Sequence, residues 1–331
     1  MSDRQQAKHT VLDYFAAIEA AEPDSMASVV EKHTADDYHF RGVHPFNEID
    51  TAAGVARDVW QPLAASFTAV QRRQDIFMAG PNLIAGDMWV TSMGKFMGLF
   101  DKPWLGIQPT GKIALIPYCE FHRVKNGEIT ESALWLDIIS VMKQSGYNPF
   151  GVQTGAEVVN PGPRTADGLL LDAQDETESA KTLELIMQMC NELVGDGMES
   201  PDDNLRNTWH EDMIWFGPSG IGATYTIERY QKQHQGPFNA GLRNIDFNGH
   251  ILEHAEGDYG GWFGWPNLRM QQGDGFLGMP ASETTTEMRV VDIYRRDGNK
   301  LAENWIFIDF LHYLKLLGVD VLERYREING V

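Results

Sequence analysis

The sequence predicts an α+β fold that occurs twice in tandem, and three observations support this prediction. The segments 131–146 (ESALWLDIISVMKQSG) and 303–318 (ENWIFIDFLHYLKLLG) share Glu, Asp, Lys and Gly at a constant offset of 172 residues. Each half of the chain begins with helical patterns and continues with strand patterns, which is typical of an α+β domain. A stretch rich in Gly and Pro separates the two halves.

The repeat extends backward from these two segments in a conserved order. The Ala-Gly-Asp turn at 85–87 corresponds to Glu-Gly-Asp at 256–258, and the strand pattern DDYHF at 36–40 corresponds to DMIWF at 212–216. The offsets drift only between 171 and 176, which indicates a duplicated domain. The Gly- and Pro-rich stretch reads as a linker. We therefore expect domain one at 1–150, a linker at 151–175 and domain two at 176–331.

Each half is expected to contain the same series of elements. Apolar residues at helical spacing predict a first helix around 11–18 in domain one and around 182–194 in domain two. A strand follows at YHF or IWF, and then a helix that closes at Trp60 or Gln235. Strands with Gly-containing turns make up the remainder. A last helix is expected at 141–145 in the first copy and, longer, at 311–325 in the second.

The composition excludes several classes of partner. The 331 residues carry a formal net charge of −20, and the pI is near 4.8. Such a chain repels nucleic-acid phosphates and anionic membranes, because Lys and Arg must supply the attraction. No secretory h-region and no uncharged apolar run of about 18 residues is visible. The only cysteines, Cys119 and Cys190, predict no disulfide framework. We expect a cytoplasmic protein with no nucleic-acid or membrane partner.

The two repeated acids, Asp137 and Asp309, stand among large apolar residues. Strand side chains alternate between faces, so Trp305 and Phe307 are expected to share a face with Asp309. A carboxyl group among such rings loses hydration, which raises its pKa and suits a general acid or base. The alternative is that these acids are solvated or paired with cations. We take Asp309 and Asp137 as the candidate catalytic residues.

The pairing of the last hairpin adds further candidates. A two-residue Asn-Gly turn places Glu120 and His122 on the face of Trp135 in domain one. The equivalent pairing in domain two places Asp292 opposite Trp305. A three-residue loop would reverse these faces. On the two-residue reading, each domain gathers acids and aromatic rings on one sheet face. The candidate substrate-binding residues from this pattern are Trp135, Glu120, His122, Asp292, Trp305 and Phe307.

Three residues near the start of domain two complete the expected pocket. Trp215 lies on the first strand, and Tyr230 precedes His234 by one helical turn. Core packing is the alternative for Trp215, and stabilisation by a helix dipole is the alternative for His234. We include all three as candidate substrate-binding residues.

Two other patterns predict neither a metal nor a cofactor. His250, His254 and Asp258 have metal-ligand spacing only if they lie on a helix, and the neighbouring glycines favour a strand instead. The Gly-rich runs at 217–222 and 260–264 lack the strand–loop–helix context of a dinucleotide site. We therefore expect no metal and no cofactor.

The pattern Glu-x-Trp-x-x-x-Asp at 303–309, followed by Leu-Gly at 317–318, resembles the closing hairpin of SnoaL-like polyketide cyclases in the NTF2-like superfamily. The resemblance continues through 215–222, 234–238 and Gly-Trp265-Pro, so it covers most of domain two. Domain one resembles the family more weakly. The resemblance implies two tandem cone-shaped α+β barrels that form a pseudo-dimer within one chain, and it leaves a homo-oligomer open. It also adds Trp265 to the substrate-binding candidates.

In this family an Asp on the last strand acts as acid and base with the help of a His, which the resemblance implies for Asp309 and Asp137. Phe96 takes the position of that His in domain one, and a Gln takes it in domain two. Domain two keeps Trp305 where domain one has Ala133, so we expect it to hold the better pocket.

The resemblance implies a cofactor-independent acid/base enzyme, a polyketide-cyclase-like lyase or isomerase acting on a small, largely apolar carbonyl compound. The missing His favours the alternative, a non-catalytic protein that binds such a ligand. An epoxide hydrolase ranks third, because it needs an Arg beside Asp309 and Arg289 is expected to point away.

Overall fold

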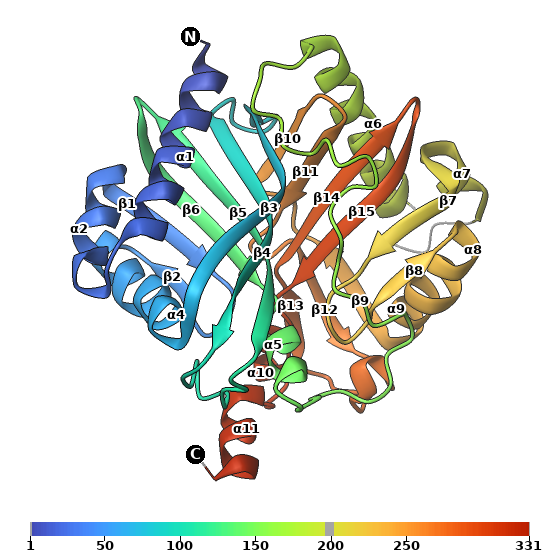
Figure 1. Cartoon of the computed structure of the whole chain (residues 1–331). Helices are drawn as coiled ribbons and strands as arrows, with labels where there is room; N and C mark the ends of the chain where they lie inside the picture. Colours follow the sequence, from blue (N-terminus) through green and yellow to red (C-terminus); the bar gives the residue numbers. More distant parts are fainter. Residues whose placement is uncertain (1, 196–201, 331) are drawn as a thin grey trace. The chain divides into compact units, whose positions relative to one another are not determined.

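The computed structural model describes residues 2–195 and 202–330, and each of its two compact units contains a curved sheet with helices packed on it (Figure 1). Unit 1 consists of Met1–Tyr147, Arg164–Ala173 and Asp320–Val331, and unit 2 consists of Asn148–Pro163 and Gln174–Val319. Part of the expected linker and the C-terminal segment thus belong to the first unit. Within the described ranges, no helix is long and apolar enough to cross a membrane.

Unit 1 has a six-stranded sheet in the order β2-β1-β6-β5-β4-β3, in which only β1 and β6 run parallel. Helix α1 packs on β3 to β6. Its N-terminus is capped by Ser2, and Val11, Tyr14 and Phe15 are buried at helical spacing. The elements are α1 Asp3–Ala20, α2 Met26–His33, β1 Thr34–Gly42, β2 Asn47–Ile49, α3 Ala52–Val55, η2 Ala56–Trp60, α4 Gln61–Ser66, β3 Phe67–Pro81, β4 Met88–Phe100, β5 Ile113–Lys125, β6 Glu128–Leu136, α5 Ile138–Gln144 and α11 Val321–Asn329.

Unit 2 repeats this plan with a sheet in two parts, ordered β10-β11-β14-β15-β7-β8 and β13-β12-β9. The parallel pair is β7 with β15, the counterpart of β1 with β6. The predicted α+β duplication is therefore confirmed. The elements are α6 Glu176–Gly195, α7 Asp202–Thr208, β7 Trp209–Phe216, β8 Ala223–Tyr225, α8 Ile227–Tyr230, η3 Gln231–Gln235, α9 Gly236–Gly241, β9 Leu242–Phe247, β10 Leu252–Glu256, β11 Tyr259–Phe263, β12 Leu268–Gln272, β13 Thr285–Met288, β14 Val290–Asp297, β15 Lys300–Ile308 and α10 Phe310–Leu316.

The three long strands of unit 1, β3 to β5, are each broken in two in unit 2. Between β11 and β12, Pro266 has no N–H for the ladder, and the side chain of Asn267 accepts a hydrogen bond from Val290 N over 3.0 Å. Residues beside the breaks, namely Phe247, His250 and Met288, line a cavity under the helices. The strand breaks of unit 2 thus lie beside this cavity.

The closing hairpin of each unit contains a β-bulge that reverses the predicted pairing. In unit 1 the Asn126-Gly127 turn has two residues, as predicted, and both have positive φ. Arg123 pairs with Glu131 whereas Val124 pairs with Ile129, so Thr130 is the extra residue. In unit 2 the residue left over is Ala302, between Leu301 and Glu303.

Because of the bulge, the predicted assignment of the hairpin side chains to the two faces of the sheet was wrong. Asp292 pairs with Ile306, and Trp305 pairs with Ile293. Glu120 pairs with Leu134 rather than with Ala133. Because a shift of one residue moves a side chain to the other face, Asp292 and Trp305 lie on opposite faces of the sheet.

Helix boundaries also differ from the prediction. The helices expected to close at Trp60 and Gln235 continue through π-helical turns into α4 and α9. The single long helix expected at the end of the chain is two helices, because Gly318 with φ 85° follows the first of them. The second, α11, packs within unit 1, where the Tyr325 hydroxyl accepts a hydrogen bond from Gln108 N over 3.0 Å.

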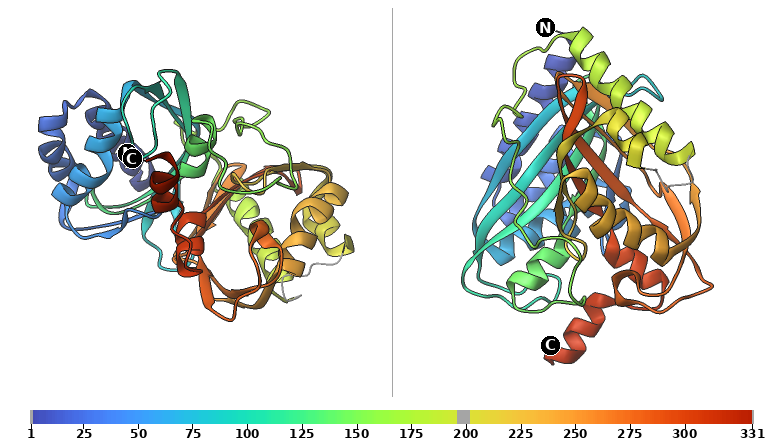
Figure 2. Two further views of the ribbon diagram at one scale, coloured as in Figure 1. Left: turned by 90° about the horizontal axis from the view of Figure 1, so that it is seen from below. Right: turned by 90° about the vertical axis from the view of Figure 1, so that its right-hand side faces the viewer.

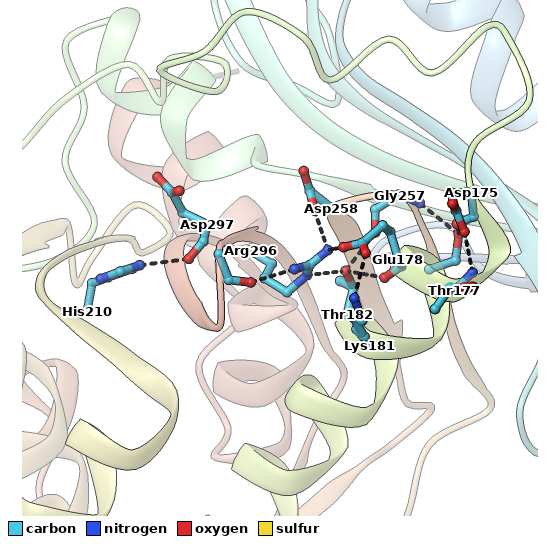
Figure 3. Close-up of polar contacts among 12 residues, drawn as sticks. Asp175, Thr177, Glu178, Lys181, Thr182, His210, Gly257, Asp258, Arg296 and Asp297 are labelled. Atoms are coloured by element: carbon cyan, nitrogen blue, oxygen red, sulfur yellow. Dashed lines mark hydrogen bonds and ion pairs between the residues drawn. The ribbon is translucent and has the colours of Figure 1, made fainter.

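Arg296 on β14 ties helix α6 to the sheet of unit 2 (Figure 3). Its guanidinium donates to Thr182 Oγ1 over 2.7 Å and to Glu178 Oε2 over 2.6 Å. It also donates to Asp258 Oδ1 in the β10–β11 turn over 2.5 Å. These bonds fix the start of α6, and the later turns of this helix supply Met189 and Cys190 to the cavity.

Candidate functional site

Unit 2 contains a cavity of about 120 Å³ between its helices and the sheet. The helices contribute Cys190 from α6 and His234 from η3. The strands contribute Trp215 from β7, Asp292 from β14 and Ile306 from β15. Most of the lining is apolar or aromatic, so the few polar groups stand out as candidates for recognition or chemistry.

Asp292 is a buried acidic side chain of this lining. It is 6% exposed, and Asn304 Nδ2 donates a hydrogen bond to its Oδ1 over 2.9 Å. Burial raises the pKa of Asp292 well above its usual value, and the hydrogen bonds from Asn304 and Tyr294 only partly oppose this effect. The carboxyl group is therefore favoured in its protonated form, in which it can donate a hydrogen bond to a ligand.

Glu120 holds the corresponding position in unit 1 but has the opposite electrostatics. Its Oε2 lies 2.5 Å from Arg72 Nη1, and its Oε1 lies 3.3 Å from His122 Nε2. Burial acts to raise the pKa of Glu120, but Arg72 and His122 outweigh it, and the pKa is lowered. The register of the strands places Phe247 at the position of Arg72 and Tyr294 at the position of His122.

Aromatic rings surround the Arg72 guanidinium in the interior of unit 1. Its Cζ lies 3.7 Å from the centroid of Phe15, 4.7 Å from that of Phe96 and 5.0 Å from that of Tyr118. The predicted binding residues Glu120 and His122 are thus part of a buried ion-pair network. Trp135, the third candidate in this unit, is fully buried and packs edge-to-face on Phe121.

The structure brings the predicted residues Trp215, Tyr230 and His234 together with Asp292 in the unit 2 cavity. The rings of Trp215 and His234 stack at 3.9 Å, and the ring of Tyr230 lies 5.4 Å from His234. Burial lowers the pKa of His234 to about 3, so the imidazole is neutral near neutral pH. These rings form an aromatic cluster in the lining that suits an apolar ligand.

Three other predicted residues are not among those that line this cavity. Trp305 lies on the opposite sheet face, where its Nε1 donates to Pro161 O over 2.9 Å and its ring stacks on Phe216. Phe307 shares that face of β15. Trp265 packs against Arg289, with the guanidinium carbon 3.9 Å from the ring centroid.

Asp309 and Asp137 are the N-cap residues of the helices that follow the last strands. Asp309 Oδ1 accepts a hydrogen bond from His312 N over 3.1 Å, and Asp137 Oδ1 accepts one from Ser140 N over 2.8 Å. Asp309 Oδ2 also lies 3.4 Å from Arg289 Nη1, so the expectation that Arg289 points away was wrong. Neither Asp lines the cavity, and their catalytic role stays a prediction.

Sequence reasoning missed several polar groups of the cavity, among them His250 and Asn239. His250 was considered only as a metal ligand, yet its Nδ1 lies 2.9 Å from Glu253 Oε1 and its ring stacks on Trp262 at 4.1 Å. Asn239 Oδ1 is buried without a hydrogen-bond partner among the described residues. A His three residues before a Glu at the start of a strand was the available signal for the first. Nothing in the sequence distinguishes Asn239.

Part of the chain matches a known protein family. Residues 19–145 match the family described as SnoaL-like polyketide cyclase. No curated protein matches the chain.

Three solved structures illustrate the similarity, and each spans less than half of the chain. A proposed SnoaL-like polyketide cyclase from Jannaschia sp. CCS1 is 19% identical, covers 45% of this chain and 98% of its own, and has a TM-score of 0.36. An NTF2-like protein from Burkholderia xenovorans LB400 is 14% identical, with coverages of 42% and 96% and a TM-score of 0.32. A proposed polyketide cyclase from Streptomyces antibioticus is 17% identical, with coverages of 43% and 99% and a TM-score of 0.35.

The family match falls within unit 1, and unit 2 repeats the strand order and the parallel pair of that unit. The chain therefore contains an α+β unit that is similar to SnoaL-like polyketide cyclases over residues 19–145, followed by a second copy of the same plan.

Proposed function

We propose that unit 2 is a cofactor-independent acid/base catalyst of the lyase or isomerase type, acting on a small, largely apolar carbonyl compound. The environment of Asp292 is the main observation in support of this proposal. Asp292 is a buried carboxyl group with a raised pKa in an apolar cavity, next to an uncharged amide instead of a cation. Such a group is suited to donate a hydrogen bond or a proton to a carbonyl oxygen.

The surroundings of Asp292 support this role. As negative charge develops on a carbonyl oxygen, a fixed donor in a dry cavity stabilises it more than it stabilises the neutral ground state. Asn304 holds the carboxyl group in place, and Tyr294 contributes a second hydrogen bond. The stacked rings of Trp215 and His234 would hold an apolar ring system beside it.

Unit 1 supports the choice of unit 2 as the active copy. The side chains of Arg72 and His122 neutralise Glu120 there, and the rings around Arg72 occupy the interior. A paired, anionic carboxylate cannot donate a proton. We therefore assign a structural role to the interior of unit 1.

A non-catalytic binding protein is the second candidate. The largely apolar lining and the stacked wall of Trp215 and His234 favour it, since both would recognise a ligand without any chemistry. For the epoxide-hydrolase alternative, the nearby pair of Asp309 and Arg289 is present, but neither residue lines the cavity.

Proton exchange tests the proposal without knowledge of the natural substrate. The full chain is incubated in D₂O with cyclopentanone, cyclohexanone or 2-cyclohexenone, and loss of the α-proton signals is followed by NMR. We expect Asp292→Asn to slow the exchange by about 10²–10⁴-fold, the usual contribution of a general acid or base.

The matched control is Asp309→Asn, which changes a carboxyl group outside the cavity and keeps a residue that can cap a helix. Exchange that persists in Asp292→Asn but is lost in Asp309→Asn would contradict the proposal and return the role to Asp309. Wild-type chain that binds these ketones without exchanging their protons would identify a binding protein.

A further inference from the structure

The geometry points to His250, oriented by Glu253, as the base that removes a proton from the carbon next to the substrate carbonyl while Asp292 holds the carbonyl oxygen. This inference rests on the proposed function of the unit 2 cavity. It names the second half of the proton-transfer machinery, and with it the class of substrate.

The imidazole of His250 is held on two sides. Its Nδ1 lies 2.9 Å from Glu253 Oε1, and its ring is parallel to that of Trp262 within 10° at 4.1 Å. A carboxylate partner at Nδ1 favours the tautomer with the proton on Nδ1 and leaves the lone pair on Nε2. The side chain of His250 is only 2% exposed and lines the cavity. The imidazole of His250 is therefore placed as a base, and the carboxylate of Glu253 fixes its orientation.

His250 and Asp292 are both neighbours of Trp262. The register of β11 and β14 pairs Trp262 with Asp292, so both side chains project from the same face of the sheet. His250 stacks on the ring of this same Trp262. Cys190 on α6 lines the same cavity as His250, Trp262 and Asp292.

The groups around His250 come from four elements. Glu253 lies on β10, Asp292 on β14 across Trp262, and Cys190 on α6. Phe247 on β9 contributes an edge-to-face ring at 5.0 Å. The acid thus lies on β14 and the base in the segment between β9 and β10, and both line the cavity.

The proposed step conserves atoms and electrons. The α-carbon–hydrogen bond breaks, and the proton moves to Nε2 of His250. The electron pair of that bond forms a carbon–carbon double bond, and the π pair of the carbonyl moves to oxygen, which takes the proton of Asp292. An enol, an imidazolium held by the Glu253 carboxylate and an Asp292 carboxylate result. Return of the proton to a different carbon gives an isomer, and both side chains regain their starting state.

This arrangement specifies an uncharged ketone with an activated α-hydrogen, such as a β-diketone or an unsaturated ketone. A neutral imidazole is a modest base, so the hydrogen that it removes has to be acidified by a second carbonyl or a double bond. The cavity lining, which is mostly apolar, suits such a neutral molecule.

Unit 1 lacks both members of the pair. Its strand register places Phe77 at the position of Glu253, because Phe77 pairs with Ser92 and Ser92 lies beside Glu120. Gln74, three residues before Phe77, donates a hydrogen bond over 3.1 Å to Oγ of Ser92, the residue at the position of Trp262. The copy with a neutralised carboxylate therefore also has no base, which is expected if the acid and the base work together.

The tautomer of His250 gives a first test that needs no turnover. Full-length protein with ¹⁵N-labelled histidine is examined by two-bond ¹H–¹⁵N NMR, and His250→Gln assigns the resonance. We expect a protonated Nδ1 and an unprotonated Nε2, with a shift of the Nε2 resonance when acetylacetone is added. A proton on Nε2 of the wild-type chain overturns the inference.

Proton exchange of acetylacetone and 2-cyclohexenone gives the second test. His250→Gln should lower kcat by about 10²–10⁴-fold. Glu253→Gln should lower kcat with little change in KM, because the imidazole loses the partner that orients it.

The outcomes separate this inference from the proposed function. Exchange that is lost in Asp292→Asn but unchanged in His250→Gln overturns the role of His250 and leaves that of Asp292 in place. Wild-type protein that exchanges neither probe overturns both. Circular dichroism and thermal unfolding of each variant show whether a loss arises from misfolding, and a folded His250→Gln protein that has lost exchange supports the inference.

Discussion

Asn304 donates a hydrogen bond to Asp292 from the neighbouring strand, over 2.9 Å, in a cavity where the equivalent carboxylate of unit 1 meets an arginine and a histidine. The difference changes the chemistry of the carboxyl group. An amide satisfies one oxygen without adding charge, so burial governs the proton affinity of Asp292. The same fold thus holds an ion-paired carboxylate in one copy and a carboxyl group with a raised pKa in the other.

The raised pKa of Asp292 predicts how stability depends on pH. Above the ordinary Asp pKa of 3.8, the unfolded chain loses this proton while the native chain retains it, so the free energy of unfolding falls as pH rises through this window. Asp292→Asn cannot ionise. We expect the variant to gain stability relative to wild type as the pH rises from about 4 toward neutrality.

Urea unfolding of the wild-type and Asp292→Asn chains across this pH range measures how the proton of Asp292 changes the free energy of unfolding. Asp309→Asn is the control. Parallel stability curves for the wild-type and Asp292→Asn chains would contradict the raised pKa and, with it, the role of Asp292 as a proton donor.

The lowered pKa of His234 predicts a dependence of the opposite sign. Between about 3 and the ordinary value of 6.5, the unfolded chain binds a proton that the native chain does not. Stability is therefore lost as the pH falls below 6.5. His234→Phe keeps a ring against Trp215 and removes the titration, so its stability should change less between about pH 4 and 6.5. Thermal unfolding at several pH values checks this, and equal slopes for both chains would show that His234 titrates normally.

Removal of the helix-capping side chains is expected to lower stability without lowering the rate of proton exchange. Asp137→Ala and Asp309→Ala each remove the side chain that accepts from the first turn of a helix, at a cost of about 0.5–2 kcal/mol. Asp309→Ala also removes the partner of Arg289 and should be the more harmful of the two. Urea unfolding gives the free energies, and the Asn variants should retain most of the stability.

Truncation of the chain after Val319 should lower the stability of unit 1 rather than that of unit 2. The truncated chain lacks α11, whose Val321, Leu322 and Tyr325 are 3–4% exposed within unit 1. Each buried apolar side chain of this size contributes about 1.5–3 kcal/mol. Hydrogen exchange should accelerate at the amide of Gln108, which loses the Tyr325 hydroxyl as its partner. Faster exchange confined to β14 and β15 would contradict the assignment of α11 to unit 1.

Local patterns in the sequence were sufficient to predict much of the fold and part of the site. The repeat at an offset of 172 residues, the helical spacing around Val11 and the strand at Trp215 predicted an α+β domain present twice. Trp215, Tyr230 and His234 were expected to share a pocket, and they do. These features depend on periodicity and spacing, which are fixed within a few residues of the chain.

Only the tertiary structure decided which side chains meet. One extra residue in the closing hairpin, at Thr130 and again at Ala302, reverses the faces of everything beyond it, and no local propensity distinguishes a bulge from a regular pair there.

The contrast between the two interiors arises in the same way. Glu120 is neutralised by Arg72, which stands 48 residues earlier in the chain on another strand, whereas Asp292 finds Phe247 in that place. The charge of a carboxyl group is set by its neighbours in space, and pairings between distant strands depend on the packing of the whole sheet rather than on the sequence around either residue.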